Sequence, residues 1–417
     1  MKKSFAIVVL LVFINYIFTP VSQAFSSDEE FLDKLEHDSI LYFVCETNPA
    51  NGLIKDSSRP GAPSSVAAVG FGLVALCIGD SRKWIDTKEA YDRVLRTLLT
   101  FRDKVPNEHG FFYHFLHMST GQRVWNSEVS SIDTALFLAG ALFCGEYFKG
   151  TEVEKVARGL YERVDWPWMM NGKKILCMGW KPEQGFLWYY WDSYSEAMIL
   201  YALAIGSPTH PIPREAWFEW KRPVDSYKDF ELIYCYTGSA FTYQYPHAWI
   251  DFRNLYENNT NYFTNSVRAL AANRQFCIDK AILYKTYGED CWGLTACLGP
   301  EGYKGYGAKP GEALHDGTIA PSGMGGSMVF DKEAALRGLK YLYDKYGNFL
   351  YGKYGFKDAF NIRKNWWAEE YLGIDVGITL LMIENSRTGL VWKKFMGLEP
   401  IKRWVELCFP KQLNQNP

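Results

Sequence analysis

The chain has 417 residues, of which 48% are hydrophobic and 17% aromatic, so it is long enough to bury a large core. Its formal net charge is −2 and it lacks a long basic run, which argues against a nucleic-acid partner. The 15 Trp, 27 Tyr and 27 Phe residues suit stacking against sugar rings and the packing of a helical core equally well.

The first residues have the pattern of an export signal. Two lysines precede an apolar run from Phe5 to Phe18, and small residues lead to a cleavage site after Ala24. An uncleaved membrane anchor is the competing interpretation, but the apolar run is short for a membrane span. No Cys follows it for a lipid anchor. We therefore expect residues 1–24 to be a signal peptide and the mature protein to be periplasmic or secreted, without a stable membrane anchor.

Two kinds of helical segment alternate along the rest of the chain. Segments that are apolar on every side begin at intervals of roughly 50 to 70 residues, near Ser64, Ser130, Ser193, Thr264, Ser322 and Gly373. Amphipathic helices with a charged face are predicted between them, at 28–44, 87–104, 152–163 and 331–346. Six such helical hairpins, with the apolar helices inside, predict an all-α fold, an (α/α)6 barrel.

Four long aromatic loops lead into the apolar segments, at 110–128, 179–196, 242–254 and 292–326. We expect them to gather on one face of the barrel, and loops of this length are usually functional. A cleft lined by Trp, Tyr, His and carboxylates suits a polyhydroxylated ligand better than a lipid. No linker rich in Pro, Gly or Ser divides the chain, so we expect a single, monomeric domain over residues 25–417.

Three carboxylates occupy unusual positions near the starts of apolar segments. Asp133 lies in SSIDTALFLAGALF, Glu196 in SYSEAMILYALAIG and Asp375 in GIDVGITLLMI. A helix that is apolar all round is buried, and burying an unpaired carboxylate costs several kcal/mol. Each of the three therefore needs either a partner or a function.

Helix capping is the structural alternative for the first two carboxylates. Ser130 and Ser193 each lie three residues before the acid, which is the spacing of a capping box. Leu372 occupies that position before Asp375, so the capping box cannot explain the third carboxylate. Asp375 is therefore the strongest catalytic candidate on physical grounds alone.

The sequence offers no strong metal or nucleophile motif. The nine Cys lack a CxxC pair, the seven His lack HExxH, and His114 and His117 lie in GFFYHFLH, which alternates like a strand. Neither GxSxG nor a P-loop is present, which disfavours serine hydrolases and nucleotide enzymes, and no DxDD run supports a terpene cyclase. We expect no metal and no cofactor.

Several long motifs resemble one known family. SSIDTALFLAG, YSEAMILYALAIGSPTHPIP, YQYPHAWIDFR, EGYKGYGA, DGTIAPSGMGGS and LGIDVGITLLMIENSRTGLVW occur in that order between residues 64 and 397. They are similar to the glycoamylase-like domain family, which includes bacterial endo-β-1,2-glucanases and a domain of cyclic β-1,2-glucan synthases. The resemblance implies an (α/α)6 barrel and, for the glucanase members, inverting hydrolysis of β-1,2-glucan.

One motif departs from the family pattern. Family members usually read close to GLTASDGPDGY, whereas this chain reads GLTACLGPEGY. Cys297 and Leu298 thus replace a small polar residue and an acidic residue. Altered specificity or reduced activity is the expected consequence.

Inverting glycoside hydrolysis assigns distinct roles to the carboxylates. It needs one protonated acid at the leaving oxygen and one ionised base that activates water. Glu196 follows the aromatic run WYYWDSYS, whose rings could desolvate it and keep it protonated, so we assign it as the general acid. Asp375, at the positive end of a helix, is assigned as the general base. Asp133 is expected to hold water or a sugar hydroxyl.

Substrate contacts are predicted in the converging loops, although each residue is about as well suited to packing. The candidates that could stack on rings or bind hydroxyls are Trp191, Tyr194, His247, Trp249, Trp292, Tyr303 and Tyr306. Two polar candidates are Arg253 and Asp316, and pairing of Arg253 with Asp251 or Asp316 is the competing interpretation.

The most favoured function at this stage is an exported endo-β-1,2-glucanase whose partner is a β-glucan oligo- or polysaccharide. A transglycosylase or chain-length controller acting on the same glucans would use the same acids. A glycan-binding protein without activity is the third possibility, but retention of all three carboxylates argues against it.

Overall fold

The computed structural model describes residues 25–309 and 311–410, so the predicted signal peptide lies outside the described residues. Its helices are α1 (Asp28–Cys45), α2 (Val66–Ser81), α3 (Thr87–Asp103), α4 (Ser131–Tyr147), α5 (Glu152–Glu162), α6 (Trp166–Met170), α7 (Met198–Gly206), α8 (Ala216–Glu219), α9 (Ala240–Trp249), α10 (Tyr262–Lys280), α11 (Pro321–Gly325), α12 (Lys332–Leu350), α13 (Gly373–Arg387), α14 (Leu390–Phe395) and α15 (Glu399–Cys408).

The strands pair into small antiparallel sheets, and none in the described part of the chain is longer than four residues. They are β1 (Ser64–Ser65), β2 (Asn107–Glu108), β3 (Phe111–Phe112), β4 (Phe115–Leu116), β5 (Val129–Ser130), β6 (Gly179–Lys181), β7 (Gly185–Phe186), β8 (Val224–Tyr227), β9 (Phe230–Ile233), β10 (Tyr256–Glu257), β11 (Thr260–Asn261), β12 (Ala296–Gly299), β13 (Gly302–Gly305), β14 (Tyr351–Gly352), β15 (Gly355–Phe356), β16 (Phe360–Asn361) and β17 (Trp366–Trp367).

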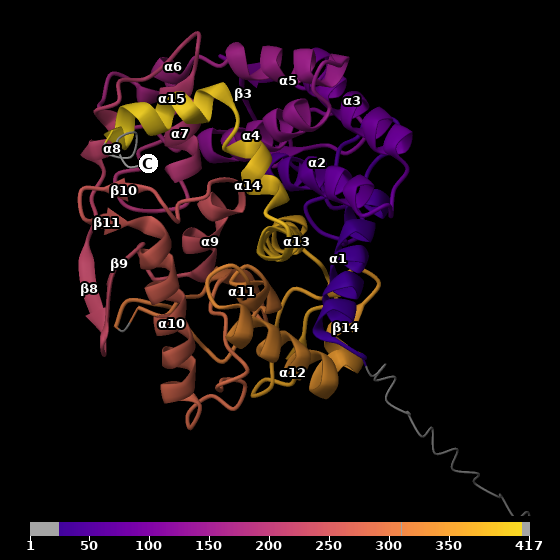
Figure 1. The fold of residues 1–417 in the computed structure, drawn as a ribbon, viewed down its shortest axis with the longest axis vertical. Coiled ribbons are helices and arrows are strands. Elements are labelled where there is room, and N and C mark those ends of the chain that lie inside the picture. Colours follow the sequence, from indigo (N-terminus) through magenta and orange to yellow (C-terminus); the bar gives the residue numbers. More distant parts are fainter. Residues whose placement is uncertain (1–24, 310, 411–417) are drawn as a thin grey trace, which may run out of the picture.

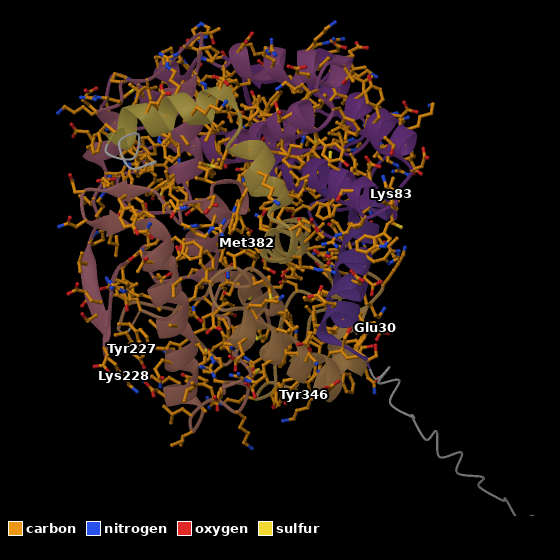
Figure 2. The ribbon with its side chains drawn as sticks, viewed as in Figure 1. Glu30, Lys83, Tyr227, Lys228, Tyr346 and Met382 are labelled. Atoms are coloured by element: carbon orange, nitrogen blue, oxygen red, sulfur yellow. The ribbon has the colours of Figure 1, made fainter. Side chains whose placement is uncertain are left out.

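The most apolar helices form the centre of the molecule (Figure 1). Helices α2, α4, α7, α9 and α13 contact one another in a closed cycle, and nearly all of their residues are buried. The amphipathic helices α1, α3, α5 and α12 pack outside this cycle through one face each. Figure 2 shows Met382 of α13 in the interior and Lys83 at the periphery. The expectation of a helix-rich fold is confirmed.

The four amphipathic helices begin within one residue of their predicted starts. Three of them are capped by a polar side chain that accepts a backbone N–H of the first turn, from Ser27, Asp86 and Asp331. Such caps satisfy donors that a helix start would otherwise leave free, which is why these boundaries are readable from sequence.

One inner helix differs from the prediction. The segment near Thr264 belongs to α10, which buries only part of its surface, whereas the inner position is taken by α9. Helix α9 overlaps the segment 242–254, which we expected to be a loop, and it contains a proline, Pro246, which normally interrupts a helix. Here the helix continues past Pro246 for three residues and ends at Trp249.

Helices α2 and α4 pack backbone to backbone at a pair of glycines. A Cβ atom on Gly140 would lie 2.1 Å from the carbonyl oxygen of Gly70, and one on Gly70 would lie 2.3 Å from that of Leu136. These distances leave no room for a side chain at either position. The close approach fixes how the starts of α2 and α4 lie relative to each other.

Short strands lead directly into the two helices. Strand β1 precedes α2 and pairs with β4, while β5 precedes α4 and pairs with β6. The backbone N–H of His114 donates to the carbonyl of Glu128 over 2.9 Å, which ties the β3–β4 segment to the residues before α4. This arrangement brings polar side chains from both segments to one end of the helical centre. In the described ranges, no helix combines the length and apolar character needed to cross a membrane.

Candidate active site

A cavity of about 730 Å³ lies at the N-terminal ends of α2, α4 and α13. Its ionisable lining consists of Asp56, Arg59, His114, Asp133, Glu196, Tyr245, Tyr303 and Glu370. Further aromatic walls come from Phe115, Trp125 and Phe241. The volume is typical of small-ligand pockets, and acids facing aromatic rings suit a hydroxyl-rich ligand.

Asp133 is held in place by a helix cap and by a cation. The Ser130 hydroxyl accepts the backbone N–H of Asp133 over 3.2 Å and donates to the Asp133 carboxylate. The carboxylate also lies 3.5 Å from Nε2 of His114. Burial raises the pKa of Asp133, whereas His114 and Ser130 lower it. The capping interaction is therefore present, and the same carboxylate still reaches the cavity.

His114 bridges two carboxylates. Its Nδ1 lies 3.0 Å from Glu128, opposite the contact that its Nε2 makes with Asp133. Burial lowers the pKa of His114, but Asp133, Glu128 and Asp56 together raise it to about 9. The side chains of His114, Glu128 and Asp133 are close enough to one another to hold a metal ion. At neutral pH, however, the imidazole carries a proton on both nitrogens, so the arrangement favours an ion-pair cluster.

Glu196 has no such partner. Helix α7 begins only at Met198, and its cap, Ala197, makes no side-chain hydrogen bond, so the predicted capping box with Ser193 does not form. Oε2 of Glu196 is buried without a hydrogen-bond partner among the described residues. Burial raises the pKa of Glu196 to about 7, and the nearby charge of Asp133 adds to the effect. The environment keeps this carboxyl substantially protonated near neutral pH.

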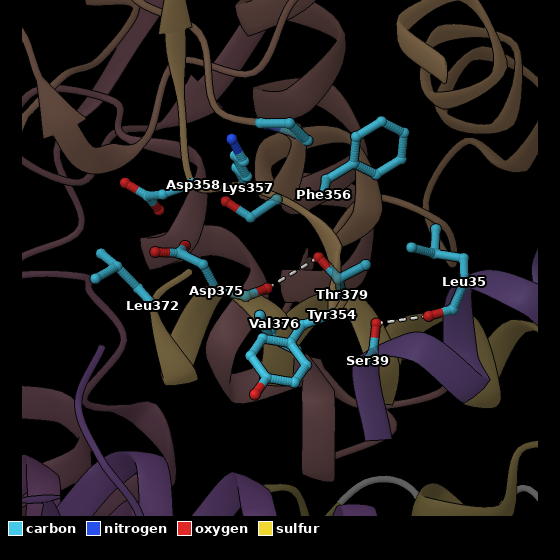
Figure 3. A pocket seen from close by; sticks show the side chains of 12 residues that line it. Leu35, Ser39, Tyr354, Phe356, Lys357, Asp358, Leu372, Asp375, Val376 and Thr379 are labelled. Carbon is cyan, nitrogen blue, oxygen red and sulfur yellow. Dashed lines mark hydrogen bonds between the residues drawn. The ribbon is translucent and has the colours of Figure 1, made fainter. Parts of the chain in front are cut away.

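Asp375 lies in the first turn of α13, where Leu372 provides no side-chain cap, as expected. Its neighbours Leu372 and Ile374 line the large cavity, whereas Asp375 itself lines a smaller one together with Asp358 (Figure 3). Leu372 lines both cavities. Burial raises the pKa of Asp375 to about 6, while the neighbouring Asp358 and Ser322 hold it lower than burial alone would.

Two tyrosines connect Asp375 to the large cavity. The pKa of Tyr245 is raised well above its usual value by burial and then by the charge of Asp375, with a further effect from Glu196. Burial, Asp375 and Asp358 raise the pKa of Tyr303 in the same way. Both tyrosines line the large cavity, so the charge of Asp375 acts on groups that border it.

Sequence reasoning missed several lining residues. Asp56 and Arg59 precede α2, and Glu370 precedes α13, in loops that carry no periodic pattern. Burial raises the pKa of Asp56 to about 6, against the lowering effect of His114. Tyr245 lies in the segment 242–254, which we expected to be a loop and which forms part of α9 instead. Asp56 and Glu370 could have been found from their position, because each lies shortly before an inner helix. The four aromatic loops were predicted to line the cleft for the same reason.

Most of the predicted substrate contacts lie in the core instead. Six of them are buried outside the cavity lining: Trp191, Tyr194, His247, Trp249, Trp292 and Tyr306. Trp191 donates to Ser131, and Tyr194 packs against Tyr262. Burial lowers the pKa of His247 to about 3, so it is a neutral core residue. His247 and Trp249 lie on the inner helix α9, and Trp292 and Tyr306 belong to a second buried cluster around β12 and β13.

The polar candidates are engaged elsewhere. Arg253 forms a two-pronged ion pair with Asp251, which was the competing interpretation. Asp316 accepts from Thr318 and pairs with Lys364 at 3.1 Å. Of the nine predicted contacts, only Tyr303 lines the cavity.

The unusual GLTACLGPEGY motif also borders the site. Leu298 lines the cavity with an apolar side chain, and Cys297 beside it is buried in strand β12. The backbone N–H of Leu298 donates to Oδ2 of Asp358 over 2.6 Å. Leu298 therefore contributes a backbone donor and an apolar surface to this part of the site.

A comparison with protein families matches the Glycoamylase family model to residues 188–399, just over half of the chain. The chain belongs to the Glycoamylase family. The matched region includes Glu196 and Asp375 and begins after Asp133. The family expected from the sequence motifs is thereby confirmed.

The chain is similar to proteins whose names refer to β-1,2-glucan or its oligosaccharides. It is 29% identical to the exo-β-1,2-glucooligosaccharide sophorohydrolase (non-reducing end) of Parabacteroides distasonis, over 91% of this chain and 58% of that protein. The chain thus spans a little over half of the length of that curated relative.

Two solved structures have closely similar folds. The endo-β-1,2-glucanase of Chitinophaga pinensis, in complex with sophorotriose and glucose, superposes with a TM-score of 0.86 at 28% identity, covering 92% of this chain and 98% of that chain. The β-1,2-glucanase of Parabacteroides distasonis gives a TM-score of 0.87 at 27% identity, covering 92% of this chain and 60% of that chain.

Proposed function

We propose that this protein is a glycoside hydrolase that cleaves β-1,2-glucan, with endo cleavage as the favoured mode. The observation that carries the proposal is Glu196, whose Oε2 is buried without a hydrogen-bond partner among the described residues, in a cavity that also holds the carboxyl groups of Asp56 and Asp133. Its raised pKa suits a general acid, and the names of the relatives support the substrate class.

The mechanism we propose is inversion at the anomeric carbon. Glu196 donates its proton to the glycosidic oxygen, so the leaving sugar departs as an alcohol. Asp375 accepts a proton from the water that attacks the anomeric carbon from the opposite face. The pKa values of about 7 and about 6 allow the acid to be protonated while the base is ionised.

Asp133 is proposed to orient substrate or water rather than to exchange a proton. Its contact with the protonated His114 stabilises the ionised form, which can accept hydrogen bonds from sugar hydroxyls. Tyr303 is the one predicted stacking residue that lines the cavity, and Trp125 and Phe115 add further aromatic walls. Together they offer a surface with both flat rings and acceptors.

The architecture that we propose is an (α/α)6 barrel. The closed cycle of five inner helices, the short α11 packed against α13, and the outer amphipathic helices support it. We further propose that the protein is exported with cleavage after Ala24, acts in the periplasm or outside the cell, and is a monomer. The lysines and apolar run at the start of the sequence support export.

A substrate panel tests the function. The protein, beginning at Phe25, is incubated with linear β-1,2-glucan and with β-1,3-, β-1,4- and α-1,4-glucans, and new reducing ends and product sizes are followed. We expect cleavage of the β-1,2-linked polymer into short oligosaccharides. Release of disaccharide alone from one end would favour exo action, and longer or cyclic products would favour a transglycosylase. Without new reducing ends from any of these glucans, the hydrolase proposal fails.

A further inference from the structure

Trp125 is the most exposed aromatic residue in the lining of the large cavity. It is 68% exposed, compared with 53% for Tyr303, whereas Phe115, Phe241 and Tyr245 are half-buried or buried. The indole ring lies 5.0 Å from the ring of Phe115, at an angle of 58°. Most of Trp125 therefore remains open to solvent beside the cavity.

The backbone of Trp125 is strained. Its φ angle is +58° and that of Asn126 is +49°, in the left-handed region that residues with a Cβ atom rarely adopt. Asn tolerates this conformation and Gly adopts it freely, but a bulky aromatic residue there is unusual. Among the nine non-glycine residues with positive φ in the described ranges, only Trp125 lines the large cavity. Strained residues of this kind cluster at functional sites.

The turn that carries Trp125 is held by its neighbours. The backbone N–H of Ser127 donates to the carbonyl of Val124 over 3.1 Å, so Trp125 is one of the two central residues. Positive φ at both central residues is the pattern of a type I′ turn, where Asn, Asp or Gly is the usual choice. Arg123 donates to the carbonyl of Ser127 over 2.5 Å and forms a two-pronged ion pair with Glu183. A ring presented in this way loses little freedom when a ligand binds.

A row of ring contacts connects Trp125 with a proposed site carboxylate. Phe115, which lies beside Trp125, stacks on the imidazole of His114 with 3.8 Å between the ring centroids. The imidazole lies 3.5 Å from Asp133. Trp125 is thus two ring contacts away from Asp133, so a sugar stacked on the indole is a different unit of the chain from a sugar at Asp133.

Packing does not account for this aromatic residue. A largely exposed ring gains little from burial, and glycine would adopt the turn with less strain. A flat indole beside a cavity with carboxyl groups is instead suited to cover the apolar C–H face of a sugar ring while the carboxyl groups accept from its hydroxyls.

We propose that Trp125 is a substrate-binding residue that stacks on a glucose unit next to the sugars at the cleavage position, and that its strained turn holds the indole ready for this contact. Tyr303 of the β12–β13 hairpin lines the same cavity, so two distant segments offer exposed rings to a ligand of several sugar units. The inference rests on the proposed function for the identity of the ligand, a β-1,2-linked glucan.

Calorimetric binding of linear β-1,2-glucan to E196Q measures this contact without turnover. In the E196Q background, we expect W125A to raise Kd about tenfold and W125F, which keeps a flat ring, to stay within about threefold. W188A is the matched control, because Trp188 is 92% exposed but lies outside the cavity lining, and its Kd should stay within about twofold. An unchanged Kd in W125A, equal weakening by W125A and W188A, or no measurable binding to E196Q would overturn the proposal.

Thermal unfolding separates a binding role from a structural one. W125G removes the ring and also relieves the strain, so we expect its Tm to stay within about 2 °C of wild type or to rise, while glucan binding weakens as in W125A. A fall in Tm of more than about 5 °C in both W125G and W125A would show that the ring supports the fold, and the proposal would fail.

Cleavage assays distinguish this inference from the proposed function. In an active enzyme, W125A should raise KM for the polymer more than it lowers kcat, and a loss confined to kcat would contradict a contact away from the cleaved bond. If wild type cleaves no glucan, the hydrolase proposal fails, but weaker glucan binding by W125A would still establish the contact. A crystal structure of E196Q with β-1,2-glucan should show a sugar ring against the indole, and glucan in the cavity without that contact would refute the inference.

Discussion

Glu196 and Asp133 show how the surroundings give two buried carboxyls different tasks. Asp133 has a hydroxyl donor and an imidazolium within reach, so its charge is compensated. Glu196 has neither, and burial raises its pKa to about 7. The difference in partners, rather than in residue type, distinguishes a carboxylate that accepts hydrogen bonds from an acid that donates a proton.

The pH dependence of activity follows from the two proposed catalytic groups. Asp375 must be ionised, which requires a pH above its pKa of about 6, and Glu196 must be protonated, which requires a pH below its pKa of about 7. We expect kcat/KM against pH to be bell-shaped with a narrow maximum between these values. A profile that is flat from pH 5 to 9 would contradict the pairing of roles.

Replacing Glu196 by Gln should abolish most activity and stabilise the fold. Without the acid we expect kcat to fall by at least about a hundredfold. In the folded protein the pKa of Glu196 is about 7, above its usual 4.5. The free energy of unfolding of the wild type therefore falls as the pH rises from 4.5 to about 7. E196Q avoids this loss, and its free energy of unfolding should exceed that of wild type on the order of 2 kcal/mol at pH 8, with little difference at pH 4.

Urea unfolding at the two pH values measures this difference. The activity and the stability should change in opposite directions, which is the signature of a group buried for function. An E196Q protein that is less stable than wild type at pH 8 would show that Glu196 has a structural partner instead.

At the scale of elements, the direct contact of α2 with α4 sets the shape of the cleft. Both helices start at the cavity, and their backbones touch at Gly70 and Gly140. A methyl group at position 140 would have to push the carbonyl of Gly70 aside, because the gap is 2.1 Å. We expect G140A to lower the free energy of unfolding by about 1–3 kcal/mol.

Gly159 provides the control for this substitution. It lies on the exposed side of α5, and nothing lies within 4 Å of a Cβ atom added there. G159A should therefore be neutral or stabilising by up to about 1 kcal/mol, because alanine is the better helix former. Chemical denaturation of G140A and G159A measures the free energy of unfolding of each. Equal destabilisation of the two variants would contradict the backbone contact between Gly70 and Gly140.

How much the sequence predicts depends on the kind of element. Amphipathic helices such as α1 and α3 carry both a periodic pattern and a cap, so their starts are predicted closely. Helix α9 is not predicted, because most of it falls in the segment 242–254 that we expected to be a loop, and Pro246 inside it is untypical of a helix. The acidic positions Asp133 and Glu196 are found because a charge in an apolar segment is conspicuous, whereas Asp56 and Glu370 lie in loops where charges are ordinary.

Most of the predicted aromatic contacts lie outside the cavity lining for a different reason. Rings such as Trp191 and Trp249 lie next to inner helices, and from the sequence a ring facing the core looks the same as one facing the cleft. Only the three-dimensional path of each loop distinguishes them. Aromatic content therefore indicates the class of ligand more reliably than the residues that touch it.

On the scale of the whole molecule, two cavities of different size lie at the starts of the inner helices. The large one, of about 730 Å³, lies at the starts of α2, α4 and α13, and the small one, of about 20 Å³, shares Leu372 with it. Asp375 borders the small cavity, and its charge raises the pKa of Tyr245 and Tyr303, which line the large one. A proposed base shielded in this way keeps its pKa under the control of protein groups rather than of bulk solvent.

The central claim is that this protein hydrolyses β-1,2-glucan by inversion, with Glu196 as the acid. The most direct test is to record ¹H NMR spectra during the first minutes of digestion of linear β-1,2-glucan, before the new reducing ends equilibrate. E196Q serves as the control for contaminating activity. The account predicts that the first new anomeric signals belong to the α-anomer and that E196Q produces none, whereas initial formation of the β-anomer, or undiminished turnover by E196Q, would contradict it.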